Sequence, residues 1–518
     1  MFREETTNRW IFLRKIFIFC TIAGIIIHWP LLTNRLTTAD GTWTNLYHGG
    51  YGWEISLGRW AFVLLKNLRL NYVVYNLSIA VGIASVSLAA CLVIELFNIK
   101  SFWTALVISG LWISFPGIAS VLPLYAFSGD YLFALFLSVF CVYIIRKTNK
   151  SIPLFISSFI FAFSTGIYQG YVGVTMTLCL FLVINDILSN CNLKDIYSNI
   201  RRMFFLGLLG MSEYLLFMKM SFFLLNITPS SYSGVDKIGQ HSLLDYIRYA
   251  GIAYKQFFSA YFLDSIYNNS AWYRQYFYAI LGILSIFCVV LLVIKNKIYK
   301  NICSLILLIL CFLVLPIFVC IICILAPERG MYCLTCIPLL LPSVFAVILF
   351  DKFKKTYALV IPGIFFSIIL IWNYSIYNSV SYTCMQLDFN KSYSTAIRLI
   401  ERIETNPDYT PDKKIMFVGE ISTDLYPEPY HYFNLQEQLG EENIATWGVF
   451  WSDPGGLQAT WNNFISYYCG RTYNICSVDD YYSIIKTQKF LDMPVFPDTE
   501  CIRLFDDILV IKFSNPAE

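Results

Sequence analysis

Charged residues are scarce in this chain of 518 residues, because only 14% are Asp, Glu, Lys or Arg, whereas 57% are hydrophobic. Soluble proteins carry about 25% charged and about 45–50% apolar residues. This composition therefore excludes an ordinary soluble protein and predicts a lipid bilayer around much of the chain. The formal net charge of +3 is too small to indicate a nucleic-acid partner, and the aromatic content of 18% suits a protein with many interfacial side chains.

Metal-binding motifs are also missing. The chain has four histidines and contains neither a DxD motif nor a pair of histidines at ligand spacing. The CxxC pairs at 320–323 and 333–336 lie in apolar sequence without histidine or carboxylate neighbours, which favours small buried side chains over a zinc site. We therefore predict no tightly bound cofactor or metal, although loop carboxylates could recruit a loosely bound divalent cation.

Long apolar runs are abundant instead. A helix needs about 20 residues to cross the apolar core of a bilayer at 1.5 Å per residue. The first run is too long for a cleavable signal peptide and ends in Trp29-Pro30, so we interpret it as a retained anchor. We predict about eleven membrane spans, at residues 13–32, 71–97, 102–122, 126–145, 152–167, 171–188, 203–225, 276–294, 302–325, 331–350 and 357–377.

Lysine and arginine occupy alternate connections between these spans. Short cytoplasmic loops collect such residues, and exported loops do not. The basic connections hold Arg3, Arg9, Arg14 and Lys15, then Lys100, then Arg146, Lys147 and Lys150, then Lys194, Arg201 and Arg202, then Lys295, Lys297 and Lys300, then Lys352, Lys354 and Lys355. This pattern predicts a cytoplasmic N-terminus, and an odd number of spans places the C-terminal tail outside the membrane of a bacterial cell.

The predicted fold is an α-helical polytopic membrane protein with a small extracytoplasmic α/β domain at its C-terminal end. The transmembrane domain comprises residues 1–379, with large exported loops at 33–69 and 226–275, and the second domain comprises 380–518. In the tail, hydrophobic patterns predict strands at 414–419 and 508–513 and helices at 457–468 and 480–488. Exported cysteines can persist as disulfides, so Cys469 and Cys476 are expected either to form one or to remain free.

The first exported loop contains the side chains best suited to chemistry. It offers the carboxylates Asp40 and Glu54, the guanidinium of Arg59 and the indole of Trp53 beside an apolar bundle. An arginine matches the geometry of a phosphate, and glycines in the loop let the backbone approach a ligand. The alternative is that these residues form an interfacial aromatic belt with solvated charges.

Three segments resemble the type II O-antigen glucosyltransferase family, which belongs to the GT-C membrane glycosyltransferases. They are Trp53-Glu-Ile-Ser-Leu-Gly-Arg-Trp60 after Asp40, the Tyr168-Gln-Gly-Tyr171 break, and a tail pattern from Met493-Pro-Val-Phe-Pro-Asp498 to Ile508-Leu-Val-Ile-Lys-Phe513. The closing segment departs from the family, because Asp498-Thr-Glu-Cys501 stands where members tend to have glycine and serine. The tail match is therefore weaker than the match of the first loop.

This resemblance implies transfer of a sugar, glucose in the family, from a polyprenyl-phosphate donor to a surface glycan on the outer face of the membrane. A phosphate leaves readily as an anion, so one carboxylate base that deprotonates the acceptor hydroxyl is sufficient. The resemblance assigns this role to Asp40, with Glu54 as the alternative base or as an anchor for sugar hydroxyls. A single base and direct attack predict inversion at the anomeric carbon.

The departing phosphate needs a cation near the atoms where charge develops. Arg59 and Arg329 are the candidates, and the alternative for Arg329 is an interfacial charge paired with Glu328. Asp130 is expected to be either a second acid or a helix cap. At the break between two apolar runs, Tyr168 and Gln169 either bind sugar hydroxyls or form a turn that satisfies its own backbone.

Two other kinds of membrane protein remain open. A transporter or flippase of lipid-linked sugars would use the intramembrane charges Glu213 and Lys219, but it would need neither the first loop nor a folded tail. A polysaccharide polymerase would need a late loop richer in arginine than 226–275 is. Both are alternatives to the glycosyltransferase.

Overall fold

The computed structural model describes residues 2–34, 36, 38–44, 46–148, 150–232, 234, 241–262, 272–328, 330–353, 357–421 and 453–516. The chain divides into two compact units. The first unit, called the membrane unit below, combines Met1–Leu32 with Gly49–Ser379. The second, called the tail unit, combines Thr33–His48 with Val380–Glu518. The tail unit thus includes a segment of the first loop, which the sequence alone does not indicate.

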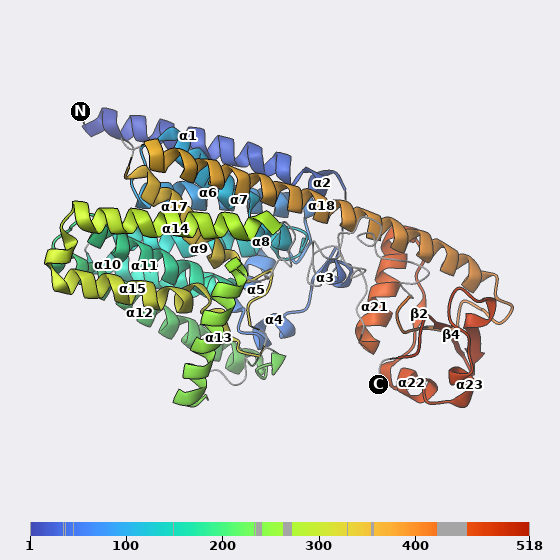
Figure 1. Ribbon diagram of the computed structural model, residues 1–518. Coiled ribbons are helices and arrows are strands. Elements are labelled where there is room, and N and C mark those ends of the chain that lie inside the picture. Colours follow the sequence, from blue (N-terminus) through green and yellow to red (C-terminus); the bar gives the residue numbers. More distant parts are fainter. Residues whose placement is uncertain are drawn as a thin grey trace. The chain divides into compact units, whose positions relative to one another are not determined.

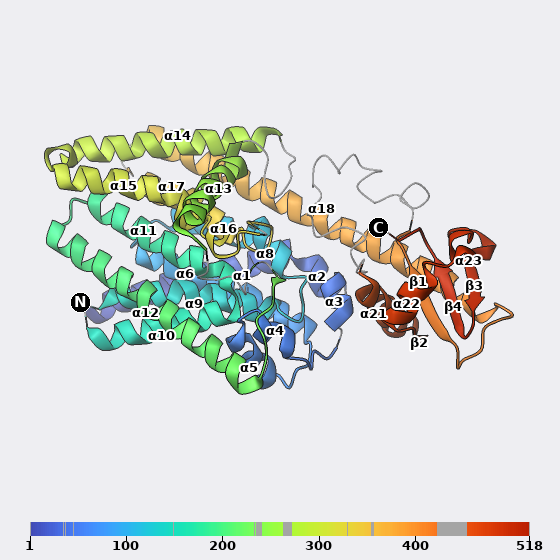
Figure 2. The ribbon, with the colours of Figure 1, turned by 90° about the horizontal axis from the view of Figure 1, so that it is seen from below.

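The membrane unit consists of helices, most of which run roughly parallel to one another (Figure 1). In chain order they are α1 (Phe2–Ile27), α2 (Trp29–Thr33), α4 (Gly52–Ser56), α5 (Trp60–Leu68), α6 (Tyr75–Leu96), α7 (Phe102–Ser114), α8 (Pro116–Val121), α9 (Ser128–Lys147), α10 (Ser151–Ile167), α11 (Val172–Leu188), α12 (Leu193–Leu225), α13 (Leu243–Phe262), α14 (Trp272–Lys295), α15 (Ile302–Val319), α16 (Ile322–Leu325), α17 (Leu340–Asp351) and the first half of α18 (Tyr357–Glu404). Helix α13 crosses the others at a steep angle (Figures 1 and 2).

Among the described residues, nine helices are long and apolar enough to cross a membrane. Each coincides with one of the eleven predicted spans. The remaining two predictions, 152–167 and 331–350, coincide with shorter apolar helices at Ser151–Ile167 and Ile337–Asp351. The structure therefore supports a multi-pass membrane protein, and the two short helices account for the difference in count.

Ion pairs join the ends of several membrane helices. Arg9 of α1 and Lys147 of α9 both contact Glu95 of α6, at 2.6 Å and 2.9 Å. Arg146 of α9 donates two hydrogen bonds to Asp186 of α11, at 2.8 Å and 2.6 Å. Such bidentate charge-assisted bonds fix geometry as well as adding energy. Basic residues that the sequence assigns to one membrane face therefore also hold neighbouring helices together.

The tail unit contains a four-stranded sheet with strand order β2-β1-β4-β3. Its strands are β1 (Lys414–Val418), β2 (Asn474–Ile475), β3 (Ile502–Phe505) and β4 (Ile508–Lys512), and its helices are α3 (Ala39–Thr44), the second half of α18, α21 (Pro454–Phe464), α22 (Val478–Ile484) and α23 (Gln488–Leu491). Strand β1 pairs in parallel with β2 and β4, whereas β3 pairs antiparallel with β4. The predicted strands and helices of the tail all have a counterpart among these elements.

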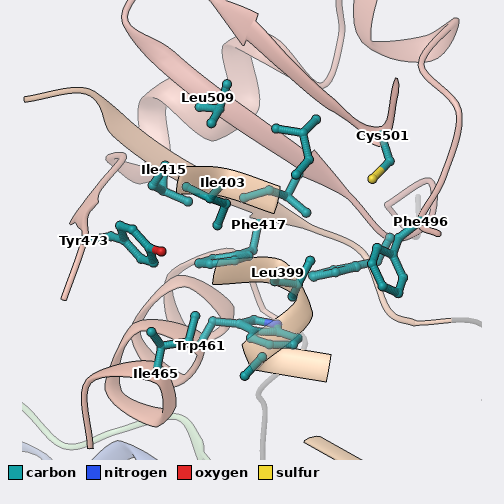
Figure 3. Packing of buried hydrophobic residues seen from close by; sticks show 14 of the residues in the cluster. Leu399, Ile403, Ile415, Phe417, Trp461, Ile465, Tyr473, Phe496, Cys501 and Leu509 are labelled. Carbon is teal, nitrogen blue, oxygen red and sulfur yellow. The ribbon is translucent and has the colours of Figure 1, made fainter. Parts of the chain in front are cut away.

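One apolar core lies between the sheet and the helices α18 and α21 (Figure 3). Phe417 of β1 stacks on Trp461 of α21, with ring centroids 5.3 Å apart, and Leu399 and Ile403 reach the same core from α18. The buried Gln458 side chain hydrogen-bonds both the backbone N–H and the carbonyl of Phe417, at 2.8 Å and 2.6 Å. A helix and a strand that are about forty residues apart are therefore held in one register.

Two features of the structure add detail to the sequence expectations. The span predicted at 357–377 belongs to a single helix that continues to Glu404, because Leu399 and Ile403 keep an apolar face buried beyond the membrane-length segment. Cys469 and Cys476 are both free thiols. Cys476 belongs to a second apolar cluster, with Met416 and Phe490, whereas Cys469 packs against the cluster that contains Trp461. Of the two outcomes that the sequence left open, the structure therefore has the free thiols.

Candidate functional site

The first loop is divided between the two units. Asp40 lies in the tail unit, whereas Trp53, Glu54 and Arg59 lie in the membrane unit. Within the membrane unit, Glu54 contacts Lys66 of α5 and Arg59 contacts Tyr131 of α9. Within the tail unit, the helix that carries Asp40 contacts Asn463 of α21. The residues that the sequence presents as one motif have separate structural surroundings.

Asp40 is half-buried in the first turn of the short helix α3. Its backbone carbonyl accepts a hydrogen bond from the Thr44 hydroxyl at 2.9 Å. The following turn packs against α21, where Asn463 Nδ2 donates to the carbonyls of Thr42 and Trp43 at 3.2 Å and 3.4 Å. The tail unit thus fixes the backbone that carries Asp40 and has a direct part in positioning this carboxylate.

Glu54 has a different environment, because only 1% of its side chain is exposed. Its Oε2 atom lies 3.9 Å from Nζ of Lys66, which is equally buried. Lys66 also donates a hydrogen bond to the carbonyl of Gly50, so it joins the start of the loop to α5. Burial lowers the pKa of Lys66, and the attraction of Glu54 opposes that shift. This is a buried ion pair that joins α4 to α5.

Arg59 follows a turn that only glycine can form. Gly58 has a φ of +75°, and a Cβ atom there would lie 2.6 Å from the Tyr214 hydroxyl and 2.8 Å from the Met218 sulfur of α12. The turn is therefore pressed against α12. Gln169 holds it from another side, because its Nε2 atom donates to the carbonyl of Leu57 at 2.7 Å and to the Tyr214 hydroxyl at 3.1 Å.

Tyrosine rings surround the Arg59 guanidinium. It lies 5.3 Å from the ring centre of Tyr168 and 5.7 Å from that of Tyr131, and its Nη1 atom donates to the Tyr131 hydroxyl at 2.8 Å. The two rings stack on each other with centroids 4.3 Å apart. The Tyr168 hydroxyl lies 3.3 Å from that of Tyr332. Cation–π contacts and one hydrogen bond orient the guanidinium without neutralising it.

The absence of an ion pair distinguishes Arg59 from Lys66 and Arg69, the other two cations of this loop that the structure describes. Lys66 is paired with Glu54, and Arg69 is paired with Asp130 and also donates to the carbonyl of Ala126. Within the described part of the chain, Arg59 forms no ion pair, and its buried Nε atom has no hydrogen-bond partner. An arginine held in this way is suited to bind an anion, because a buried cation gains most from a partner that supplies the missing charge.

Arg59 lines a cavity of about 100 Å³. The other walls come from the turn before α11, from α12, from α16 and from the segment that follows α16. Its polar lining includes Gln169, Tyr214, Tyr332 and Thr335. Apolar side chains make up most of the rest of the lining. The cavity therefore combines one cation and several hydroxyl groups with a mainly apolar wall, which suits a small anionic group with an attached polar ring.

The other predicted site residues lie as follows. Trp53 is 54% exposed and contacts the ring of Tyr232, a residue that also lines the cavity, with centroids 5.4 Å apart. Asp130 lies in the first turn of α9, but Phe127 is the N-cap residue, and the carboxylate pairs with Arg69. Glu328 is exposed. Arg329 lies outside the described residues.

Sequence reasoning missed the aromatic and basic neighbours of this site. Tyr131, Tyr214 and Tyr332 come from three distant segments, and with 36 tyrosines in the chain no local signal marks them. Lys66 and Arg69 offered a signal, since they are cations close to the loop motif. Among the described residues, no cluster of three or more His, Cys, Asp or Glu side chains is arranged to hold a metal ion.

Comparison with known proteins gives one family match. A family model described as "Glucosyl transferase GtrII" matches residues 29–350, which is more than half of the chain and includes the first loop and every residue that lines the Arg59 cavity. No curated protein matches the chain, and no solved structure matches it.

Proposed function

Since this chain belongs to the GtrII glucosyl transferase family, we propose that it transfers glucose from a polyprenyl-phosphate donor to a surface polysaccharide. The proposed reaction takes place on the outer face of a bacterial cytoplasmic membrane. In this arrangement the N-terminus is cytoplasmic and both the first loop and the tail unit are extracytoplasmic, as the alternation of basic connections predicts.

The observation that carries this proposal is the guanidinium of Arg59, which forms no ion pair with any residue that the structure describes and lines a small cavity of the membrane unit. A glycosyl phosphate places negative charge next to the bond that breaks, and that charge grows as the phosphate departs. A fixed cation at this position stabilises the transition state more than the ground state. The proposal therefore assigns the donor phosphate to Arg59, and Tyr131 and Tyr168 are the residues that orient its side chain.

We assign the general base to Asp40. Glu54 is buried and paired with Lys66, so proton transfer at Glu54 would disturb a structural ion pair. Asp40 is half-buried at the start of α3, where solvent or an acceptor can approach. The base removes the proton from the acceptor hydroxyl while that oxygen attacks the anomeric carbon, and the phosphate leaves with the bonding electrons. One displacement of this kind inverts the anomeric configuration.

Exposed groups at the cavity would bind the sugar and the acceptor. The indole of Trp53 presents a face suited to a sugar ring, and the Gln169 and Tyr332 side chains line the cavity that would hold the sugar next to the phosphate. Glu328 and Arg329 belong to the segment next to this wall, and they remain candidates for contacts with sugar hydroxyls or phosphate. No metal is required, because Arg59 supplies the positive charge, although a loosely bound cation could add to it.

The experiment that tests the function uses membranes that contain the protein and its polysaccharide acceptor. They are incubated with polyprenyl-phosphate glucose labelled in the sugar, and label in the extracted polysaccharide is measured with and without a chelator. We expect transfer in membranes with the wild-type protein and a loss of at least about tenfold with Arg59→Ala, since a lost charge-assisted contact costs about 1.5–3 kcal/mol. Movement of the intact labelled lipid across the bilayer without transfer would instead identify a flippase.

A further inference from the structure

A second, larger cavity lies in the membrane unit next to the Arg59 cavity. It has a volume of about 540 Å³ and lies between helices α11, α12 and α15. Helix α11 packs against both α12 and α15 and forms the floor, while α12 and α15 form the two walls. Phe204 and Leu208 of α12 and Leu310 of α15 are exposed along the rim. This space, called the apolar groove below, is therefore open toward the lipid.

The apolar groove adjoins the Arg59 cavity. Met211 of α12 lines both spaces, and Val172, at the upper end of the groove, directly follows the turn that carries Tyr168 and Gln169. The lining changes across this boundary. Hydroxyl groups and a guanidinium surround the small cavity, whereas almost all the side chains that line the groove are aliphatic, aromatic or methionine.

The groove has the length of one membrane leaflet. Its lining on α12 extends from Met211 to Ile200, and on α11 from Val172 to Val183. At 1.5 Å per residue each stretch covers about 16 Å, which is roughly half of the 30 Å apolar core of a bilayer. A chain bound there would run parallel to the helices, with its polar end at Arg59 and its apolar end toward the middle of the membrane.

We propose that this groove between α11, α12 and α15 binds the first isoprene units of the donor lipid, and that it thereby selects a long polyprenyl chain attached to the phosphate at Arg59. The inference rests on the proposed function. Methionines at 176, 203 and 211 supply flexible thioethers that can follow the methyl branches of an isoprenoid. The hydroxyl of Thr175, a polar side chain in the lining, donates a hydrogen bond to the backbone carbonyl of Ser138 at 2.8 Å. Its donor therefore needs no hydrogen-bond partner on the ligand.

Gly207 allows a direct test, because it lines the groove and a Cβ added there meets no atom within 4 Å. Gly207→Phe should therefore fill the groove without disturbing the packing of α12, and it replaces a poor helix former. The matched control is Gly282→Phe on α14. A Cβ at Gly282 also meets nothing within 4 Å, and this residue lines neither cavity.

The measurement is the binding of two labelled lipids to the purified full-length protein, namely undecaprenyl phosphate and dimethylallyl phosphate, whose single isoprene unit is too short to extend along the groove past Gly207. We expect Gly207→Phe to weaken binding of the long chain by at least roughly tenfold, since displacement of only two buried CH₂ groups corresponds to that factor. It should leave the short chain within about twofold of wild type. Gly282→Phe should bind both lipids as the wild type does. Arg59→Ala should weaken both, because both carry the phosphate.

Three results would overturn the inference: equal affinity of the wild type for long and short chains, unchanged binding of the long chain by Gly207→Phe, or competition by phosphatidylglycerol as effective as that by undecaprenyl phosphate. The last result would identify an ordinary phospholipid site.

Transfer of labelled glucose separates this inference from the proposed function. Selective long-chain binding without any transfer would contradict the proposed transferase activity and support the role of the groove. Normal transfer by Gly207→Phe with the long-chain donor would contradict the role of the groove alone.

Discussion

The two carboxylates of the first loop are fourteen positions apart in the sequence, yet each belongs to a different unit of the protein. Glu54 is enclosed in the membrane unit and faces Lys66, whereas Asp40 is half-buried on a short helix held by α21 of the tail unit. An ionised carboxylate that is already paired and dehydrated stabilises the fold, and changing its charge is costly. Asp40 has surroundings that better suit a group which gains and loses a proton.

The same contrast applies to the cations of this region. Lys66 and Arg69 have carboxylate partners, and Arg59 is held by tyrosine rings and hydroxyl groups. Residues of one sequence motif can therefore have either a structural or a functional role, and the charged partners that surround each side chain decide which. Substitutions can therefore test the comparison by separating turnover from stability.

The largest expected effect comes from Asp40→Asn. This change keeps the volume of the side chain but removes its ability to accept a proton, so turnover per folded molecule should fall by about 10²–10⁴-fold. Binding of the donor should be preserved, because the phosphate contact remains. Initial rates and donor affinity are measured on the same purified protein. Wild-type turnover in folded Asp40→Asn protein would rule out the assignment and return the base to another residue.

Glu54→Gln should instead act on stability. It leaves the buried ammonium of Lys66 without its counter-ion, and breaking such a pair from one side costs about 3–5 kcal/mol. The double variant Glu54→Gln, Lys66→Met should recover much of that loss, since no buried charge remains. Thermal unfolding in detergent of Glu54→Gln, Lys66→Met and the double variant measures the coupling free energy between Glu54 and Lys66. If Glu54→Gln is as stable as the wild type but loses turnover, Glu54 and not Asp40 is the functional carboxylate.

Arg59 and Arg69 form a matched pair for the cations. Arg59→Ala should weaken donor binding by about 1.5–3 kcal/mol, the value of a charge-assisted hydrogen bond, while the melting temperature changes little. Arg59→Lys should restore only part of the binding, because a lysine cannot reproduce the planar guanidinium beside the stacked rings of Tyr131 and Tyr168. Arg69→Ala should lower the melting temperature by removing the partner of Asp130. The prediction fails if the two alanine variants have the same profile of binding and stability.

The smallest expected effect lies in the tail unit. The backbone N–H and hydroxyl of Ser477, together with Lys414, lower the pKa of the Asp480 carboxyl in the folded state. The pKa of Asp480 in the folded protein is therefore below its value of about 3.9 in the unfolded chain. The ionised carboxylate stabilises the folded protein fully above about pH 3.9, and this contribution is lost as the pH falls through the pKa of the folded state. Because 32% of the Asp480 side chain is exposed and solvent screens its charge, the effect should be slight. Unfolding of wild type and Asp480→Asn, compared between pH 6 and pH 3, should show a shallower pH dependence in the variant; parallel curves would contradict it.

Much of the fold follows from one-dimensional patterns. Apolar length alone located the membrane helices, because the thickness of the bilayer sets the number of residues needed. Alternation and helical periodicity located β1, β4, α21 and α22 in the tail. The count of eleven spans was not confirmed, since α10 is a short helix of 17 residues close to the predicted 152–167, and α17 begins only at Leu340.

The candidate site was only partly predictable. The residue types of the first loop and the Tyr168-Gln169 turn identified a region where chemistry was expected, and the structure places Arg59, Tyr168 and Gln169 around one cavity. The roles of Glu54 and Asp130 depended on Lys66 and Arg69, and the sequence does not state which charges meet. The Tyr214 contact of the Gly58 turn likewise joins residues more than a hundred and fifty positions apart.

The sequence by itself determined that this is a membrane protein with a mixed α/β tail and a loop resembling a glucosyltransferase motif. These properties depend on composition, on apolar length and on local order of residues, all of which a single chain displays directly. Three properties became visible only in the folded chain. Asp40 packs within the tail unit. Lys66 and Arg69 have carboxylate partners while Arg59 lines a cavity, and Met211 lines both that cavity and the apolar groove. The physical reason is that the pairing of charges and the shape of a cavity depend on distances in space, which helix packing sets between residues far apart in the chain.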